Sequence, residues 1–251
     1  ATAVEHAVLD TSVAVPAGTV VLASAHGDLI VRDGARIDVS GVGAAAPGSV
    51  ELSAPEGELT VAAGTLLAAS ASAEAGGGRL SVDVLRLSAI DVLAAVSADF
   101  TERWMLRVRE GDARLSEAAV IRAAEIGISV DAGTLVVDGT LDASGSKGGS
   151  IVLASRRADA WNGVGEGAGD LVLGASAVLD ARATEHLSSA SGTRGEGGTV
   201  VLDASPAGAG GSSVAPLGGR IRVAEGARIE VGTATSEGVA SAAREGVVTL
   251  R

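Results

Sequence analysis

The sequence predicts an all-β chain folded as a right-handed parallel β-helix, a three-sided solenoid with roughly 30 residues per rung. A short phrase that begins with glycine and recurs along the chain supports this prediction. Its copies are "GTVVL", "GSVEL", "GRLSV", "GSIVL", "GTVVL" and "GVVTL", which begin at residues 18, 48, 78, 149, 198 and 246. The third and fifth letters are always apolar and the fourth varies, so each copy is expected to be a half-buried strand.

A second, longer phrase adds two strands to each rung. Its copies span 27–41, 57–70, 169–182 and 219–232. Each copy contains two short apolar runs separated by a turn with a glycine. In the first copy, "GDLIVRDGARIDVSG", the residues expected to face the core are Leu29, Val31, Ile37 and Val39. The first two copies of each phrase lie 30 residues apart, which predicts that equivalent side chains stack from rung to rung.

A sandwich of β-hairpins is the alternative all-β fold. It requires two-residue turns between paired strands, and Asp33-Gly34 and Asp138-Gly139 have the residue types that such turns prefer. A sandwich, however, has no reason to repeat one phrase at equivalent positions, whereas a solenoid stacks each rung on the one before. The repetition therefore favours the β-helix.

The whole chain, 1–251, is predicted to be one β-helix domain and a segment of a longer solenoid. Its three parts differ in regularity: regular rungs at 1–78, irregular rungs at 79–126, and rungs with long loop insertions at 127–251. The insertions are rich in Gly, Ala and Ser and span 154–169, 181–198 and 203–219. We expect them to leave the solenoid at its corners, where they do not disturb the stacked strands.

The least regular stretch, 83–125, is interpreted as two imperfect rungs. It contains Phe100, Trp104 and Met105, whose long apolar side chains are expected to fill a local widening of the core. A short helix is a further expectation near "SEAAVIRAAE", 116–125. Because only 1% of the chain is aromatic, the rest of the core must consist of Val, Leu, Ile and Ala.

Composition limits the classes of partner. The formal net charge of −12 repels the phosphates of nucleic acid and an anionic membrane surface, so neither is an expected partner. The absence of cysteine excludes disulfides and thiolate metal sites. No run approaches the roughly 18 continuous apolar residues that a membrane-spanning helix needs. The start, "ATAVEHAVLD", lacks the features of a secretion signal, so we expect a mature chain or a segment of a longer protein.

A row of carboxylates is the main candidate for chemistry. Its members follow the inward apolar residue of the third strand and are Asp38, Asp142, Asp180 and Glu230. Asp142, Asp180 and Glu230 would stack on successive rungs, where they are candidates for holding Ca²⁺ or for acting as an acid and base. A solvated face that keeps the solenoid soluble is the third possibility. We assign no catalytic residue and expect no cofactor.

Four phrases resemble a known family: "GARIDVSG", "GTLVVDGTLDASG" followed by "GGSIVLAS", and "GGTVVLDAS". They look like the shaft repeats of filamentous haemagglutinin-like exoproteins, β-helical adhesins that Gram-negative bacteria export by two-partner secretion. The resemblance is strongest at 18–70 and 127–232. The secretion domain of that family carries Asn-Pro motifs, which this chain lacks. The resemblance therefore implies a shaft segment, and no functional residue of the family is carried over.

These observations predict a structural or adhesive β-helical shaft of a secreted or cell-surface bacterial protein, and not an enzyme. The expected partners are a host or bacterial surface receptor or glycan, neighbouring solenoid segments, and the outer-membrane transporter of the full-length protein. Trp161, in the insertion "ADAWNG", is a possible loop contact for such a ligand. The alternatives are a polysaccharide-acting β-helix enzyme, a lyase or hydrolase, and a self-assembling extracellular filament subunit.

Overall fold

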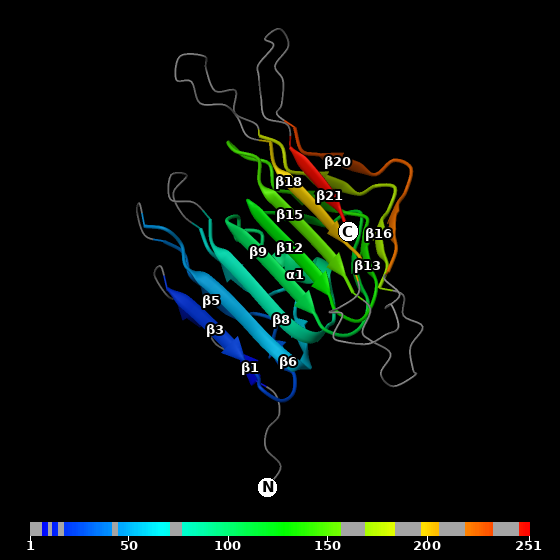
Figure 1. The fold of residues 1–251 in the computed structure, drawn as a ribbon. Coiled ribbons are helices and arrows are strands. Elements are labelled where there is room, and N and C mark those ends of the chain that lie inside the picture. The colour runs from blue at the N-terminus through cyan, green and yellow to red at the C-terminus, as the bar shows by residue number, and fades with distance from the viewer. Residues whose placement is uncertain are drawn as a thin grey trace, which may run out of the picture.

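The alternation of apolar and variable residues in the two phrases produces short strands that pair only in parallel (Figure 1). The computed structural model describes residues 7–9, 12–14, 18–41, 45–70, 77–156, 169–183, 197–205, 219–232 and 246–251. Within these residues the secondary structure is strand apart from one short α-helix. The predicted all-β class is confirmed, and the parallel sheets are those of a parallel β-helix or solenoid.

Ten strands form one sheet, called the large sheet below. In chain order they are β1 (Ala7–Leu9), β3 (Thr19–Ala23), β4 (Leu29–Val31), β6 (Ser49–Val61), β8 (Arg79–Leu87), β9 (Arg103–Val108), β12 (Glu125–Val130), β15 (Ser150–Ser155), β18 (Thr199–Asp203) and β21 (Val247–Leu250). Figure 1 shows these strands side by side, from blue near the N-terminus to red at β21. All six copies of the first phrase lie in this sheet.

The remaining strands form three smaller sheets. One contains β2 (Ser12–Ala14), β5 (Arg36–Asp38) and β7 (Leu66–Ala68). The second contains β10 (Ala113–Leu115), β13 (Leu135–Val137), β16 (Leu171–Leu173) and β19 (Ile221–Val223). The third contains β11 (Val120–Arg122), β14 (Thr140–Asp142), β17 (Val178–Asp180) and β20 (Arg228–Glu230). From β9 onward the chain visits the large sheet, the β10 sheet and the β11 sheet in turn and then returns to the large sheet.

Copies of the first phrase are stacked in register, as predicted. Val50 lies opposite both Val20 and Leu80. The row continues through the large sheet as Val20, Val50, Leu80, Trp104, Ile126, Ile151, Val200 and Val248. All of these side chains are buried except Val248 on the last strand. The four residues expected to face the core in the second phrase are also buried: Leu29, Val31, Ile37 and Val39.

Each copy of the first phrase begins with glycine because two backbone segments meet there. The Gly48 N–H donates to the Val39 carbonyl at 2.8 Å, and a Cβ on Gly48 would lie 1.7 Å from the carbonyl oxygen of Gly18. A Cβ on Gly198 would likewise lie 2.0 Å from the carbonyl oxygen of Ala181. Close approach of the backbones, and not a left-handed φ, therefore requires glycine at this corner.

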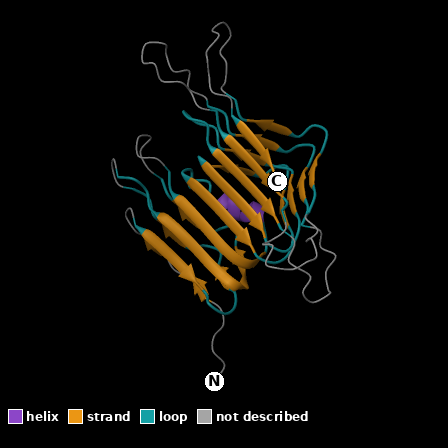
Figure 2. Ribbon diagram, in the orientation of Figure 1, coloured by secondary structure: helices purple, strands orange, loops and turns teal. Residues whose placement is uncertain are grey.

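The predicted helix at 116–125 is wrong. That stretch forms a turn and strand β11, which pairs with β14, and the helix within the described residues is α1 (Ile90–Val96). Ile90, Leu93 and Ala94 are buried and have the i, i+3, i+4 spacing of one helix face, whereas β11 buries only its central residue. Figure 2 shows α1 behind the large sheet.

The irregular stretch forms two short coils, as predicted. The register partners Arg79, Arg103 and Glu125 are 24 and 22 residues apart along the chain. In the first of these coils α1 follows β8, in the place where the preceding coil has β7. The sheet of β2, β5 and β7 ends there, and the β11 sheet begins in the next coil. The helix therefore interrupts one side of the stack while the large sheet continues past it.

Two of the three long apolar side chains of the irregular stretch fill the core. Phe100 and Trp104 are fully buried, and the Trp104 indole Nε1–H donates to the Ser97 hydroxyl at the end of α1 at 2.9 Å. The prediction for Met105 is wrong, because this residue lies on the outer face of β9 and is partly exposed. Neighbouring residues of a strand point to opposite faces, so Trp104 and Met105 cannot both point inward.

The three predicted insertions lie mostly outside the described residues. The strands that flank them belong to different sheets: β15 ends at Ser155 in the large sheet, and β16 begins at Leu171 in the β10 sheet. The same holds for the connections from β17 to β18 and from β18 to β19. Each insertion therefore lies between two sides of the stack, as predicted.

Candidate functional site

The structure brings together three of the four predicted carboxylates. Asp142 lies directly opposite Asp180, and Asp180 lies opposite Glu230, on neighbouring strands β14, β17 and β20. These three residues are called the carboxylate row below. Asp38 lies on β5 in a different sheet, opposite Ala68. The prediction that the row would stack on successive rungs is therefore confirmed for Asp142, Asp180 and Glu230.

Arginine side chains accompany the carboxylate row. Arg122 lies opposite Asp142 on β11 and donates from Nε to its Oδ2 at 2.8 Å. Arg182 donates from Nη2 to Asp180 Oδ2 at 2.6 Å, and its Nη1 lies 3.0 Å from Glu230 Oε2. The two guanidinium groups balance most of the negative charge of the row. Sequence analysis did not include them, because their partners depend on register across the rungs.

The aspartates of these strands also turn the chain at a corner. In four cases an aspartate Oδ1 accepts a hydrogen bond from the backbone N–H two residues later, at 2.8–3.0 Å. These pairs are Asp38 with Ser40, Asp142 with Ser144, Asp180 with Arg182, and Asp203 with Ser205. This is the Asx turn, for which aspartate is a preferred residue. The aspartates thus have a structural role that accounts for their repetition in the sequence.

The same contacts keep the aspartates ionised. Hydrogen bonds from Ser40 and Arg36 lower the pKa of Asp38 to about 2, and the Arg182 guanidinium lowers the pKa of Asp180. Burial acts to raise the pKa of Asp142, but hydrogen bonds from Ser144 and Arg122 outweigh it, and the pKa lies below its ordinary value. A general acid needs a raised pKa. These three aspartates are therefore held in the form that cannot donate a proton.

The carboxylate row does not offer the ligand set of a metal ion. Within the described part of the chain, no group of three or more His, Cys, Asp or Glu side chains is close enough together to hold a metal. Ca²⁺ takes six to eight oxygen ligands, and here it would also have to displace Arg122 and Arg182. The Ca²⁺ site at Asp142, Asp180 and Glu230 stays a prediction with this geometry against it.

We expect millimolar Ca²⁺ to leave the melting temperature of the chain unchanged, because the guanidinium groups already neutralise the row. Differential scanning calorimetry with and without Ca²⁺, together with calorimetric titration, measures this. The matched variant is Arg182→Gln, which removes the guanidinium shared by Asp180 and Glu230. A saturable heat of binding to the unaltered chain would establish the Ca²⁺ site instead.

Acid is expected to weaken the corner at Asp38. The folded pKa of about 2 is below the ordinary 3.8, so the ionised carboxylate contributes stability that is fully present above about pH 4 and is lost as the pH falls toward 2. Asp38→Asn keeps an oxygen acceptor for Ser40 but loses the charge, and it should cost about 1 kcal/mol at pH 7 and almost nothing at pH 2. Urea unfolding at both pH values measures the difference.

Asp38→Ala is the matched comparison, because it removes both the charge and the acceptor. Its cost should persist at pH 2, where the backbone N–H of Ser40 still lacks the oxygen that it meets at 3.0 Å in the native chain. Equal pH dependence in the native chain and in Asp38→Asn would show that the Asp38 carboxylate does not carry this effect.

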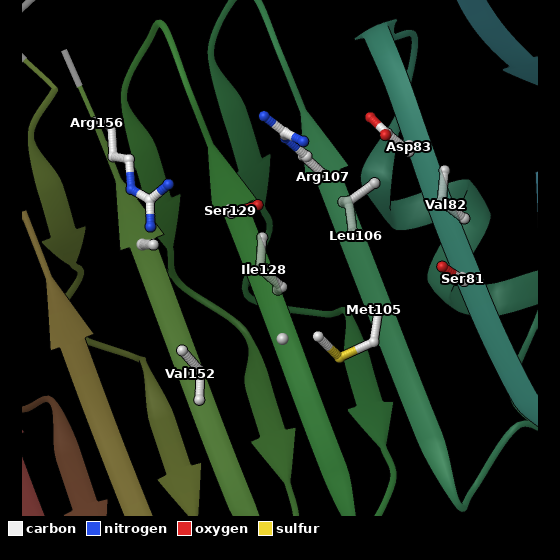
Figure 3. A pocket seen from close by; sticks show the side chains of 12 residues that line it. Ser81, Val82, Asp83, Met105, Leu106, Arg107, Ile128, Ser129, Val152 and Arg156 are labelled. Atoms are coloured by element: carbon white, nitrogen blue, oxygen red, sulfur yellow. The ribbon is translucent and has the colours of Figure 1, made fainter. Parts of the chain in front are cut away.

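A second feature, which sequence analysis did not find, is a hollow of about 370 Å³ on the outer face of the large sheet (Figure 3). Outward side chains of β8, β9, β12 and β15 line it, and they are Ser81, Asp83, Met105, Arg107, Gly127, Ser129, Val152 and Ala154. Arg156, directly after β15, completes its rim. The depression arises because Gly127, Ser129 and Ala154 are smaller than the residues around them. Only the register of four strands brings these residues together.

The polar groups of the hollow are at one end. Figure 3 shows Arg156 and Arg107 approaching Ser129 from two sides, with Asp83 beyond Arg107. Arg107 is paired with Asp131, with Nη2 and Oδ2 2.5 Å apart. Asp83 accepts two hydrogen bonds from Arg109, at 2.7 and 2.8 Å. Met105 and Val152 flank Gly127 at the other end, which is apolar.

Trp161, the predicted loop contact, lies outside the described residues. The fold itself defines a class, an all-β chain with parallel sheets of the β-helix or solenoid kind. No protein-family model, curated protein or solved structure matches the chain. None of the helical residues that the structure describes belongs to a helix long and apolar enough to cross a membrane. The function is therefore argued from the carboxylate row, the hollow and the stack of strands.

Proposed function

We propose that this chain is a structural and adhesive shaft segment of a secreted or cell-surface bacterial protein. The observation that carries the proposal is the apolar row that continues from Val20 to Val200 through successive coils while the insertions fall between sheets. Such a stack separates two jobs: the inward rows supply stability, and the insertions can vary to make contacts. This is the design expected of a spacer that displays loops.

The finer form of the fold belongs to this proposal: a right-handed, three-sided β-helix. Three sheets are visited in each coil after β9, which supports three sides. Crossover connections between parallel strands are right-handed in nearly all proteins, which supports the hand. Membership in the filamentous haemagglutinin-like family rests on the phrases quoted above. With it come the proposed partners, namely a surface receptor or glycan and an outer-membrane transporter.

Beads coated with the chain test the adhesive role. We expect them to be retained on cultured epithelial cells or on bacterial cells more strongly than beads coated with albumin at equal density. Trp161→Ala should reduce retention without changing the melting temperature if Trp161 is a contact. Retention no greater than that of albumin beads on any cell tested would contradict the adhesive role, and a far-ultraviolet circular dichroism spectrum dominated by helix would contradict the shaft.

The polysaccharide-acting enzyme is the second candidate, because Asp142, Asp180 and Glu230 do lie side by side. The lowered pKa of Asp142 and of Asp180 argues against either as the acid. Incubation with a panel of polysaccharides, followed by detection of reducing ends or unsaturated products, tests this candidate. Activity that is lost when all three residues are changed to alanine would support it; inactivity across the panel would reject it.

A filament subunit is the third candidate, because the last strands expose residues at inward positions. Val248 and Leu250 of β21 are 43% and 63% exposed, and Val223 of β19 is 52% exposed. A neighbouring solenoid segment that pairs with β21 would cover them. Light scattering over a range of concentrations tests this, with Leu250→Asp as the variant. Growth of particles that Leu250→Asp abolishes would support assembly through this edge, and a concentration-independent monomer would argue against it.

A further inference from the structure

We propose that the hollow on the outer face of the large sheet binds an aliphatic carboxylate, a ligand with a short hydrocarbon body and a single carboxylate group. This inference is independent of the proposed shaft function. It rests on the two chemically different ends of the hollow, an apolar floor and a rim with two guanidinium groups.

The floor accepts a hydrocarbon body because Gly127 has no side chain. A Cβ at Gly127 would lie 2.4 Å from Met105 Cε and 2.7 Å from Met105 Sδ, so the methionine side chain extends over the glycine. Val152, on the other side of Gly127, is 39% exposed. Methionine is flexible and adapts its shape to an apolar ligand. A ligand lying between Met105 and Val152 would remove both side chains from water.

The rim accepts the carboxylate through Arg156. Within the described residues the Arg156 guanidinium makes no salt bridge and no side-chain hydrogen bond, whereas Arg107 and Arg109 are engaged by Asp131 and Asp83. A guanidinium binds a carboxylate through two parallel hydrogen bonds. The Ser129 hydroxyl, between Arg156 and Arg107, can donate a further hydrogen bond to the same group. These donors lie on one side of the apolar floor.

The same residues disfavour other ligand classes. A sugar presents several hydroxyl groups and usually stacks on a ring, but the hollow has no aromatic lining residue and only two hydroxyl side chains, Ser81 and Ser129. A polyanion would meet Asp83 and a chain with a net charge of −12. A single negative charge joined to an apolar body makes use of both ends of the hollow.

Nuclear magnetic resonance titration of ¹⁵N-labelled protein with hexanoate tests the proposal. We expect saturable shifts of the Gly127 and Ser129 amide signals, with a Kd on the order of 1 mM for so small a ligand. Hexanamide lacks the charge and inorganic phosphate lacks the hydrocarbon body, so each should bind at least ~10-fold more weakly. Phosphate or hexanamide binding as tightly as hexanoate would overturn the proposal.

The source of the carboxylate is distinguished by a second titration with N-acetyl-leucine, which represents the last residue of a peptide. Tighter binding of hexanoate assigns a free aliphatic acid, and tighter binding of N-acetyl-leucine assigns a peptide carboxyl end. Failure of both ligands to shift the Gly127 and Ser129 signals would reject the site while leaving the shaft proposal, which does not depend on the hollow, untouched.

Three variants localise the binding. Arg156→Gln should weaken hexanoate about 10-fold, and Gly127→Leu should abolish binding by filling the floor, where the neighbouring Met105 end is free to move. Arg228→Gln, on β20 in another sheet, is the matched control and should leave the affinity unchanged. The melting temperature of each variant reports its folding. Unchanged affinity in a folded Arg156→Gln would overturn the assignment of the carboxylate to this rim.

Discussion

Replacing Trp104 with alanine is expected to lower the free energy of unfolding by about 3–5 kcal/mol. Trp104 is 1% exposed and stands in the inward row between Leu80 and Ile126, so truncation leaves a cavity in the middle of the stack. The variant also removes the indole donor that meets the Ser97 hydroxyl at 2.9 Å. Ser97 would keep only the Leu93 carbonyl, to which it donates at 2.6 Å. Urea unfolding followed by circular dichroism measures the loss.

Two substitutions separate the causes of this loss. Trp104→Phe keeps a ring in the row but not the donor, and should cost less than Trp104→Ala. Met105→Ala shortens the next side chain, which lies on the outer face of the same strand, and should change stability by no more than about 1 kcal/mol. If Met105→Ala were as destabilising as Trp104→Ala, the two faces of β9 would have been assigned wrongly.

The inward rows could be predicted from the sequence because each coil places equivalent residues in the same environment. Val20, Val50 and Leu80 stack in register, and the strict apolar third letter of the phrase is the direct consequence. The alternation of period two is visible in any single copy, and the 30-residue repeat relates the first copies to one another. Neither observation needs knowledge of a contact.

The helix and the hollow could not be predicted in this way. α1 has seven residues, and Ile90, Leu93 and Ala94 are too few to distinguish a helix from an irregular strand by periodicity. The hollow depends on Gly127 lying between Met105 and Val152, which are 22 residues before it and 25 residues after it. Because these coils are shorter than 30 residues, the repeat of the first copies does not predict that alignment.

The carboxylate row lies between these cases. The stacking of Asp142, Asp180 and Glu230 follows from the phrase, and the register confirms it. Their chemistry does not follow from the phrase, because it depends on Arg122 in the preceding coil and on Arg182. A carboxylate beside a guanidinium has a lowered pKa and a balanced charge, whereas the same carboxylate beside another carboxylate would have a raised pKa. The neighbours decide between a structural corner and a reactive site.

Replacing Gly48 with alanine is expected to destabilise the chain by more than about 4 kcal/mol, an exceptional loss for so small a change. The new Cβ would lie 1.7 Å from the carbonyl oxygen and 2.7 Å from the carbonyl carbon of Gly18. Both atoms belong to the backbone of the neighbouring coil, so no side chain can move aside. The Gly48 N–H would also be pushed from the Val39 carbonyl that it meets at 2.8 Å. Thermal and urea unfolding measure the loss.

Two other glycines show whether crowding or backbone conformation is responsible. Gly232→Ala meets no atom within 4 Å and has no left-handed φ, so it should change stability by no more than about 0.5 kcal/mol. Gly34→Ala also has open space but a φ of 78°, and should cost about 1–2 kcal/mol from strain alone. The order Gly48, Gly34, Gly232 is expected only if adjacent coils touch at the glycine of the first phrase. A Gly48→Ala chain as stable as Gly232→Ala would mean that the coils are farther apart there, and that the stacked arrangement itself is wrong.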